Sequence, residues 1–109
     1  MDLYEIAWAG GFFSGEGGIW FNQVRQYRYI RASVSQSGAG FAKPSSLKRF
    51  VAAVGFGRVV RDHTEDGHKP QWYVQYGGRR AHTLVTLLWP YLSEEKQEQY
   101  LDVVKKAAA

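Results

Sequence analysis

The sequence predicts an α+β domain: a saddle-shaped antiparallel sheet of four strands, with helices packed on one of its faces. Three observations lead to this fold class. Three largely apolar segments and one capped, charged segment predict helices, polar and apolar residues alternate in most of the predicted strands, and the strands fall in pairs between helices. The predicted order is αββαββα with one further helix. Because no long linker divides the 109 residues, we expect a single domain over residues 1–109.

The first half of the chain is predicted to contain one helix and one hairpin. Leu3–Gly15 is largely apolar and predicts the helix. From residue 18 the periodicity changes to two, so strands are expected over 18–24 and 29–36, joined by a turn at 25–28 that contains no glycine. Each strand places apolar residues on one face and polar or aromatic residues on the other. Residues 37–40, which include two glycines, are expected to end the second strand.

The second half repeats this order. Pro44 is expected at the first position of a helix whose apolar residues are spaced three and four apart, and Gly55 is expected to end it. Two strands follow, over 58–61 and 71–76, with a turn at 64–67 between them. The second unit therefore has the order of the first, although the two share little sequence.

Two helices complete the chain. A third apolar stripe runs from Ala81 to Leu88, and the helix is expected to stop before Pro90. Ser93 is predicted to cap the last helix, which has glutamates in its first turn and lysines in its last, as the helix dipole favours.

The composition excludes several classes of protein. There are no cysteines, so a disulfide framework and a thiolate zinc site are both excluded. No apolar run is long enough for a membrane span, and no basic, apolar leader begins the chain. We therefore expect an intracellular protein that is not secreted and has no membrane partner. The net charge of +4 and the pI of about 9.5 permit a polyanionic partner without requiring one.

The first predicted helix has two features that are unfavourable for a helix, one in its middle and one at its end. Gly10 and Gly11 lie in its middle, where each glycine costs roughly 1 kcal/mol relative to alanine, and the close approach of a second backbone is the usual reason for such a cost. Glu16 lies where the helix should end, at its negative pole. If two copies of the helix crossed at their small faces, two Glu16 carboxylates would meet. They would need a bridging cation, and their hard oxygen ligands suit Mg²⁺.

These residues resemble a known family motif. Ala9–Gly17 reads AGGFFSGEG and resembles the LAGLIDADG motif of homing endonucleases, often written LAGFFDGEG. The acidic residue that binds metal in that family falls on Glu16, whereas Ala9 and Ser14 depart from the usual leucine and acidic residue. Val34–Gln36 resembles the family's strand end with an active-site glutamine. Trp89–Leu92, followed by Lys96-Gln97-Glu98-Gln99, resembles its Pro-aromatic-Leu and Lys-Gln-x-Gln segments, and the predicted element order matches its domain.

The resemblance implies a site-specific endonuclease that hydrolyses phosphodiester bonds of double-stranded DNA as a homodimer. It implies a metal site of Glu16 with Gly15, occupied by Mg²⁺. Mn²⁺ is expected to substitute, and Ca²⁺ to support binding only. Gln36 would position a water, and Lys96 would act as a base or neutralise charge. The dimer would form through the small residues of the motif helix, which are Ala7, Gly10, Gly11 and Ser14.

The polar face of the predicted sheet is the candidate DNA-binding surface. Strands that display donors, acceptors and arginines can lie in the major groove, where Arg reads guanine and Asn or Gln reads adenine. A solvated sheet face is the alternative, although exposed aromatic residues argue mildly against it. The candidate residues are Trp20, Asn22, Tyr29, Arg31, Ser33, Ser35, Arg58, Gln71, Tyr73 and Gln75.

Plainer interpretations exist for each site residue. Glu16 can be a solvated carboxylate in a glycine-rich turn, and Gln36 an ordinary polar residue at a strand end. Lys96 lies at the positive end of a helix dipole, which a nearby phosphate would explain, but an exposed lysine also tolerates that position. Two other functions remain open. One is a non-cleaving DNA- or RNA-binding module, such as a regulator or an intron maturase. The other is a structural dimer without nucleic acid.

Overall fold

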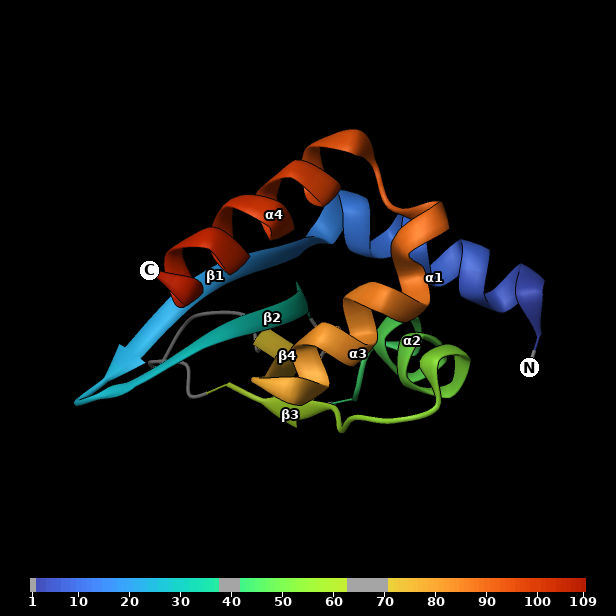
Figure 1. Cartoon of the computed structure of the whole chain (residues 1–109). Helices are drawn as coiled ribbons and strands as arrows, with labels where there is room; N and C mark the ends of the chain where they lie inside the picture. Colours follow the sequence, from blue (N-terminus) through green and yellow to red (C-terminus); the bar gives the residue numbers. More distant parts are fainter. Residues whose placement is uncertain (1, 38–41, 63–70) are drawn as a thin grey trace.

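The described part of the chain forms one antiparallel sheet with helices over one of its faces (Figure 1). The computed structural model describes residues 2–37, 42–62 and 71–109. In chain order the elements are α1 (Leu3–Glu16), β1 (Gly17–Val24), β2 (Tyr27–Ser37), α2 (Ser45–Val54), β3 (Val60–Arg61), β4 (Gln71–Gly77), α3 (Arg79–Leu88), a 3₁₀ turn (Trp89–Tyr91) and α4 (Glu94–Ala108). The strands are ordered β1–β2–β4–β3. The predicted α+β class and element order are confirmed.

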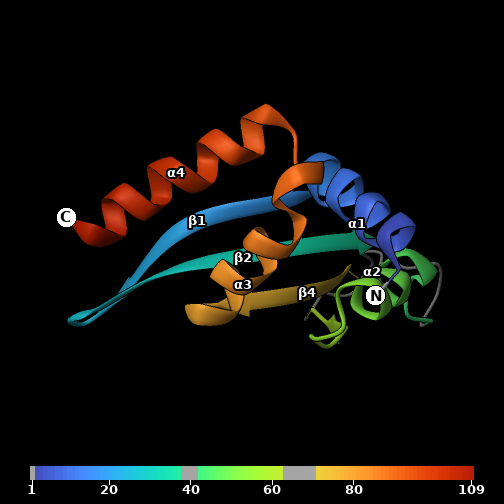
Figure 2. The same cartoon turned by 45° about the vertical axis from the view of Figure 1, so that its right-hand side comes forward.

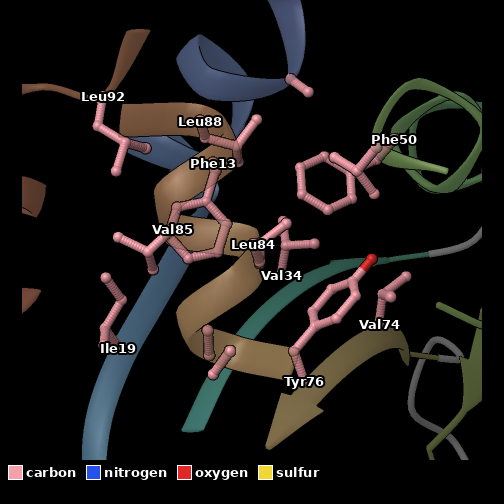
Figure 3. Close-up of a cluster of buried hydrophobic side chains, with 14 of the residues drawn as sticks. Phe13, Ile19, Val34, Phe50, Val74, Tyr76, Leu84, Val85, Leu88 and Leu92 are labelled. Carbon is pink, nitrogen blue, oxygen red and sulfur yellow. The ribbon is translucent and has the colours of Figure 1, made fainter. Parts of the chain in front are cut away.

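The core lies between the sheet and the helices because alternate strand residues are apolar. Phe13 of α1, Phe50 of α2 and Leu84 of α3 converge on the covered face of the sheet (Figure 3). Each such side chain contributes about 1.5–3 kcal/mol through its burial. The buried residues of β2 and β4 are Ile30, Ala32, Val34, Trp72, Val74 and Tyr76. The opposite face of these strands is left to polar and aromatic side chains.

The turn between β1 and β2 is tighter than the sequence predicts. Val24 pairs with Tyr27, so the turn contains only Arg25 and Gln26, and the expected turn residues Tyr27 and Arg28 belong to β2. Arg25 has a φ of 57°. Two-residue hairpin turns need such positive φ values, and glycine or asparagine usually supplies them, so this turn had no sequence signal. The hairpin tip lies at the opposite end of the molecule from α2 (Figures 1 and 2).

The second unit is also less regular than predicted. The strand expected over 58–61 contains only Val60 and Arg61. Gly57, with a φ of 112°, lies just before this segment. Pro44 is the N-cap of α2, not its first residue. Gly55 ends this helix with a φ of 89°, as expected. Most of the predicted break at 37–40 and the whole turn at 64–67 lie outside the described residues. Among the helices that the structure describes, none is long and apolar enough to cross a membrane.

Candidate active site and nucleic-acid interface

Glu16 lies at the junction of α1 and β1, as predicted. It is the last residue of α1, its side chain is exposed, and α1 has no basic residue in its last turn. The chain turns into β1 at Gly17, whose N–H donates to the Phe13 carbonyl. A Cβ at Gly17 would lie 2.6 Å from the Phe13 ring, so this tight exit excludes any larger residue. The register then places Gly17 opposite Val34 in β2.

The surroundings of Glu16 leave its carboxylate open to a ligand. No hydrogen bond or ion pair joins it to another residue within the described ranges. The last carbonyls of a helix, here those around Gly15, lack intrahelical partners. A carboxylate with neighbouring carbonyls is a hard oxygen donor set that fits Mg²⁺, but one chain supplies too few ligands to hold the ion firmly. No group of three or more potential metal ligands occurs in the described parts of the chain.

Gly10 is explained by a contact within the chain. It is buried, and a Cβ at its position would lie 2.5 Å from the Tyr91 Cβ and 3.0 Å from the Tyr91 carbonyl oxygen. The 3₁₀ turn before α4 therefore packs directly on the α1 backbone. The prediction that Gly10 contacts a second copy is wrong, because Tyr91 of the same chain occupies that space.

Ser14 also makes its contacts within the chain. Its hydroxyl donates to the Gly10 carbonyl (2.8 Å) and accepts from the Ser93 N–H (2.8 Å). These bonds fix the start of α4 against the last turn of α1, so the hydroxyl that was predicted to face a partner is already used. Sequence reasoning missed this contact because nothing local links residues 14 and 93.

The Ser14 contact has a measurable expectation. Ser14→Ala should lower the free energy of unfolding by about 0.5–1.5 kcal/mol, the net value of a typical hydrogen bond, because the Ser93 N–H loses its acceptor. Urea denaturation measures the effect. Ser46→Ala in α2 is the matched control, because Ser46 is a half-buried helical serine with no hydrogen bond to the described residues. Equal stabilities of the two variants would contradict the proposed role of Ser14.

The other face of α1 is open. Gly11 and Gly15 are exposed, and a Cβ at either would meet nothing within 4 Å. Ala7 is half-buried beside them, while Leu3 and Tyr4 are 65% and 90% exposed. Residues three and four apart lie on one side of a helix, so these residues form a continuous small and apolar surface that leads to Glu16.

The two other predicted catalytic residues lie near this junction but on different elements. Gln36 is half-buried and pairs with Trp72, so it lies on the same face of β2 as the core residues and not on the polar face. It lies two residues beyond Val34, roughly 7 Å along the strand. Lys96 lies in the first turn of α4, where its Nζ donates to Gln99 Oε1 (3.3 Å). Because Ser93 is bound to Ser14, the first turn of α4, which carries Lys96, starts beside the last turn of α1.

Three residues of the predicted DNA-binding face form a connected group. Asn22 Nδ2 and an Arg31 terminal nitrogen both donate to the Tyr29 hydroxyl, at 2.9 Å and 3.1 Å. The Arg31 guanidinium also lies over the Tyr29 ring, 5.5 Å from its centroid. Its Nε is buried without a hydrogen-bond partner. These contacts hold the guanidinium in one orientation before any ligand binds, which lowers the entropy cost of a hydrogen bond to a base.

The remaining predicted face residues divide by element. Their burial alternates opposite to that of the core, so the sheet displays them on its uncovered side. Arg58 is the exception, because it precedes β3 and is not part of the sheet. Val24 and Tyr27 continue the same face toward the hairpin tip, 51% and 64% exposed, and were not predicted. The face residues on strands are Trp20, Asn22, Tyr29, Arg31, Ser33, Ser35, Gln71, Tyr73 and Gln75.

Comparisons with known proteins identify the fold. No protein-family model matches the chain, and no curated protein does. Among solved structures, it is similar to the LAGLIDADG homing endonuclease I-GzeII in complex with its DNA target, with 24% sequence identity and a TM-score of 0.65. The match covers 99% of this chain and 37% of that one. The fold is LAGLIDADG-like. The chain thus spans little more than a third of the length of that endonuclease.

Proposed function

We propose that the chain is a homodimeric, Mg²⁺-dependent endonuclease that cuts a long, nearly palindromic DNA duplex. The observation that carries the proposal is the open Glu16 carboxylate. It lies at the end of the open stripe of small residues on α1, which consists of Ala7, Gly11 and Gly15. One copy provides a single such carboxylate. A second copy packed on the stripe would bring a second Glu16 to the same place and complete a hard oxygen site.

The proposed chemistry assigns a separate role to each of the predicted site residues. Glu16 of each copy, with the Gly15 carbonyl, would hold Mg²⁺, which activates water and stabilises the attacking and leaving oxygens of a phosphodiester. Lys96 would neutralise charge that develops on the phosphate, and Gln36 would orient the water. Mn²⁺ is expected to replace Mg²⁺. Ca²⁺, with its looser coordination, is expected to support binding without cleavage.

The uncovered face of the sheet would read the duplex. It offers guanidinium, amide and hydroxyl groups, and the fixed Arg31 guanidinium is suited to the O6 and N7 acceptors of guanine. Each copy would read one half-site, because a two-fold symmetric dimer presents the same face twice. The DNA-bound state of the similar endonuclease supports a nucleic-acid partner for this fold.

Selection of bound duplexes from a randomised pool tests the proposal. Ca²⁺ replaces Mg²⁺ so that bound DNA stays intact. A consensus of two inverted half-sites, longer together than one helical turn, is the expected result. An asymmetric consensus would contradict the homodimer, and no enrichment would contradict site-specific binding. Enrichment of single-stranded or structured RNA in a parallel pool would favour a maturase-like role instead.

A further inference from the structure

A polar cleft opens at the β3 edge of the sheet, away from Glu16. Its volume is about 450 Å³, and it is lined by Gly57, Arg58, Val60, Tyr73, Gln75 and Arg80. The cleft exists because β3 is so short. Val60 pairs with Tyr73 and Arg61 with Trp72, so among the described residues Gln75 has no partner in β3. Because β3 lies three strands from β1, the cleft is roughly 14 Å across the sheet from the strand that follows Glu16.

Two guanidinium groups from different elements line this cleft. Arg58 precedes β3 and Arg80 lies in the first turn of α3. In the described ranges neither forms an ion pair or hydrogen bond, and no acidic residue lines the cleft. Two like charges at one opening repel each other, so the arrangement gains free energy when an anion binds between them.

The position of Arg80 in its helix is a second unfavourable electrostatic feature, in addition to the repulsion between the two guanidinium groups. The first turn of α3 has no acidic residue, and its N-cap, Gly78, provides no side-chain hydrogen bond. A cation at this positive end of the helix is disfavoured. The guanidinium lies over the Phe56 ring, 5.8 Å from the centroid, which holds it at the cleft. Burial raises the pKa of the Tyr76 hydroxyl, and the Arg80 charge partly offsets that rise.

We propose that Arg58 and Arg80 form a phosphate site that binds one backbone phosphate of each half of the duplex. Arginine binds the oxygens of a phosphate through paired, charge-assisted hydrogen bonds, and Tyr73 and Gln75 supply neutral donors in the same lining. The phosphate is distinct from the one that is cut. It fixes the position of the duplex and carries no sequence information. The inference rests on the proposed function, and it adds Arg80 to the interface as a positioning residue.

Replacing single phosphates with neutral methylphosphonates in a selected duplex tests the site. Neutralising one phosphate per half-site should weaken binding by the wild-type chain three- to tenfold. Arg58→Gln and Arg80→Gln should each lower the slope of log affinity against log salt, and the double variant should lower it by about one per copy, because the pair contacts one phosphate in each half. The double variant should also no longer respond to that methylphosphonate. Arg79→Gln is the matched control, because Arg79 is the exposed neighbour of Arg80 in α3 and does not line the cleft. It should leave the response intact.

A second measurement separates this inference from the proposed function. Inorganic phosphate is titrated into the chain alone, and the Nε–H signals of Arg58 and Arg80 are followed by NMR. Shifts at both residues, absent for Arg79, support the site even if no duplex is bound, and would then assign it to free phosphate. Normal duplex binding with no methylphosphonate effect and no change in either variant overturns the inference while leaving the proposed function standing. Absence of both shifts and duplex binding overturns both.

Discussion

Glu16→Gln is expected to lower the rate of Mg²⁺-dependent cleavage by about a thousandfold or more while changing duplex affinity by less than about threefold. The amide keeps the shape of the carboxylate but removes the charge that holds the cation, and a homodimer loses both copies at once. Removing one preorganised group that stabilises transition-state charge already costs roughly a hundred- to a thousandfold. Affinity is preserved because Glu16 lies at the α1–β1 junction and not among the residues of the uncovered sheet face.

Single-turnover cleavage of the selected duplex in Mg²⁺ measures the rate, and binding in Ca²⁺ measures the affinity. Glu98→Gln is the control, because Glu98 is an exposed glutamate on α4 and lies outside the proposed site. It should cleave at the wild-type rate. Full activity of Glu16→Gln would end the metal-ligand assignment, and equal loss in both variants would attribute the effect to net charge.

Gly10→Ala and Gly11→Ala are expected to change stability in opposite directions although the two glycines are neighbours. Gly10→Ala should lower the free energy of unfolding by about 1–3 kcal/mol, the cost of overpacking, because its Cβ would collide with Tyr91. Gly11→Ala meets open space. It should raise the stability of the monomer by up to about 1 kcal/mol, since alanine favours the helix. Urea denaturation at low protein concentration compares the two.

The same pair of variants tests the proposed dimer. If the open stripe of α1 is the interface, Gly11→Ala should weaken self-association while stabilising the monomer, because the added methyl separates two closely packed helices. Sedimentation over a range of concentrations measures this. A dimer that is unaffected by Gly11→Ala would place the interface elsewhere, and a loss of stability equal to that of Gly10→Ala would contradict the orientation of α1.

The elements that follow from local periodicity were predicted to within one or two residues. β1, β4 and α3 are examples, because burial of alternate or three-and-four-spaced side chains leaves a direct pattern in the sequence. The errors in the predicted element bounds lie where the backbone adopts a conformation that side-chain periodicity does not report. Arg25 adopts a positive φ without a glycine signal, and β3 is two residues shorter than predicted, just after Gly57 with its positive φ.

The candidate site was also predictable only where its features are local in the sequence. The location of Glu16 at the end of a helix follows from the glycines around it. By contrast, the contacts of Gly10 with Tyr91 and of Ser14 with Ser93 join distant parts of the chain, and no local pattern reports them. Arg80 did have a signal. Two arginines follow Gly77-Gly78 at the start of a helix, the same electrostatic cost that drew attention to Lys96.

Cleavage of the selected duplex by the wild-type chain decides whether this protein is a metal-dependent endonuclease. Both strands are end-labelled, and cutting is followed in Mg²⁺, in Ca²⁺ and with a chelator. We expect cuts on both strands at positions related by the two-fold axis of the site, in Mg²⁺ only. Tight, sequence-specific binding with neither strand cut in Mg²⁺ would contradict it, and the chain would then be a binding module on a LAGLIDADG-like fold.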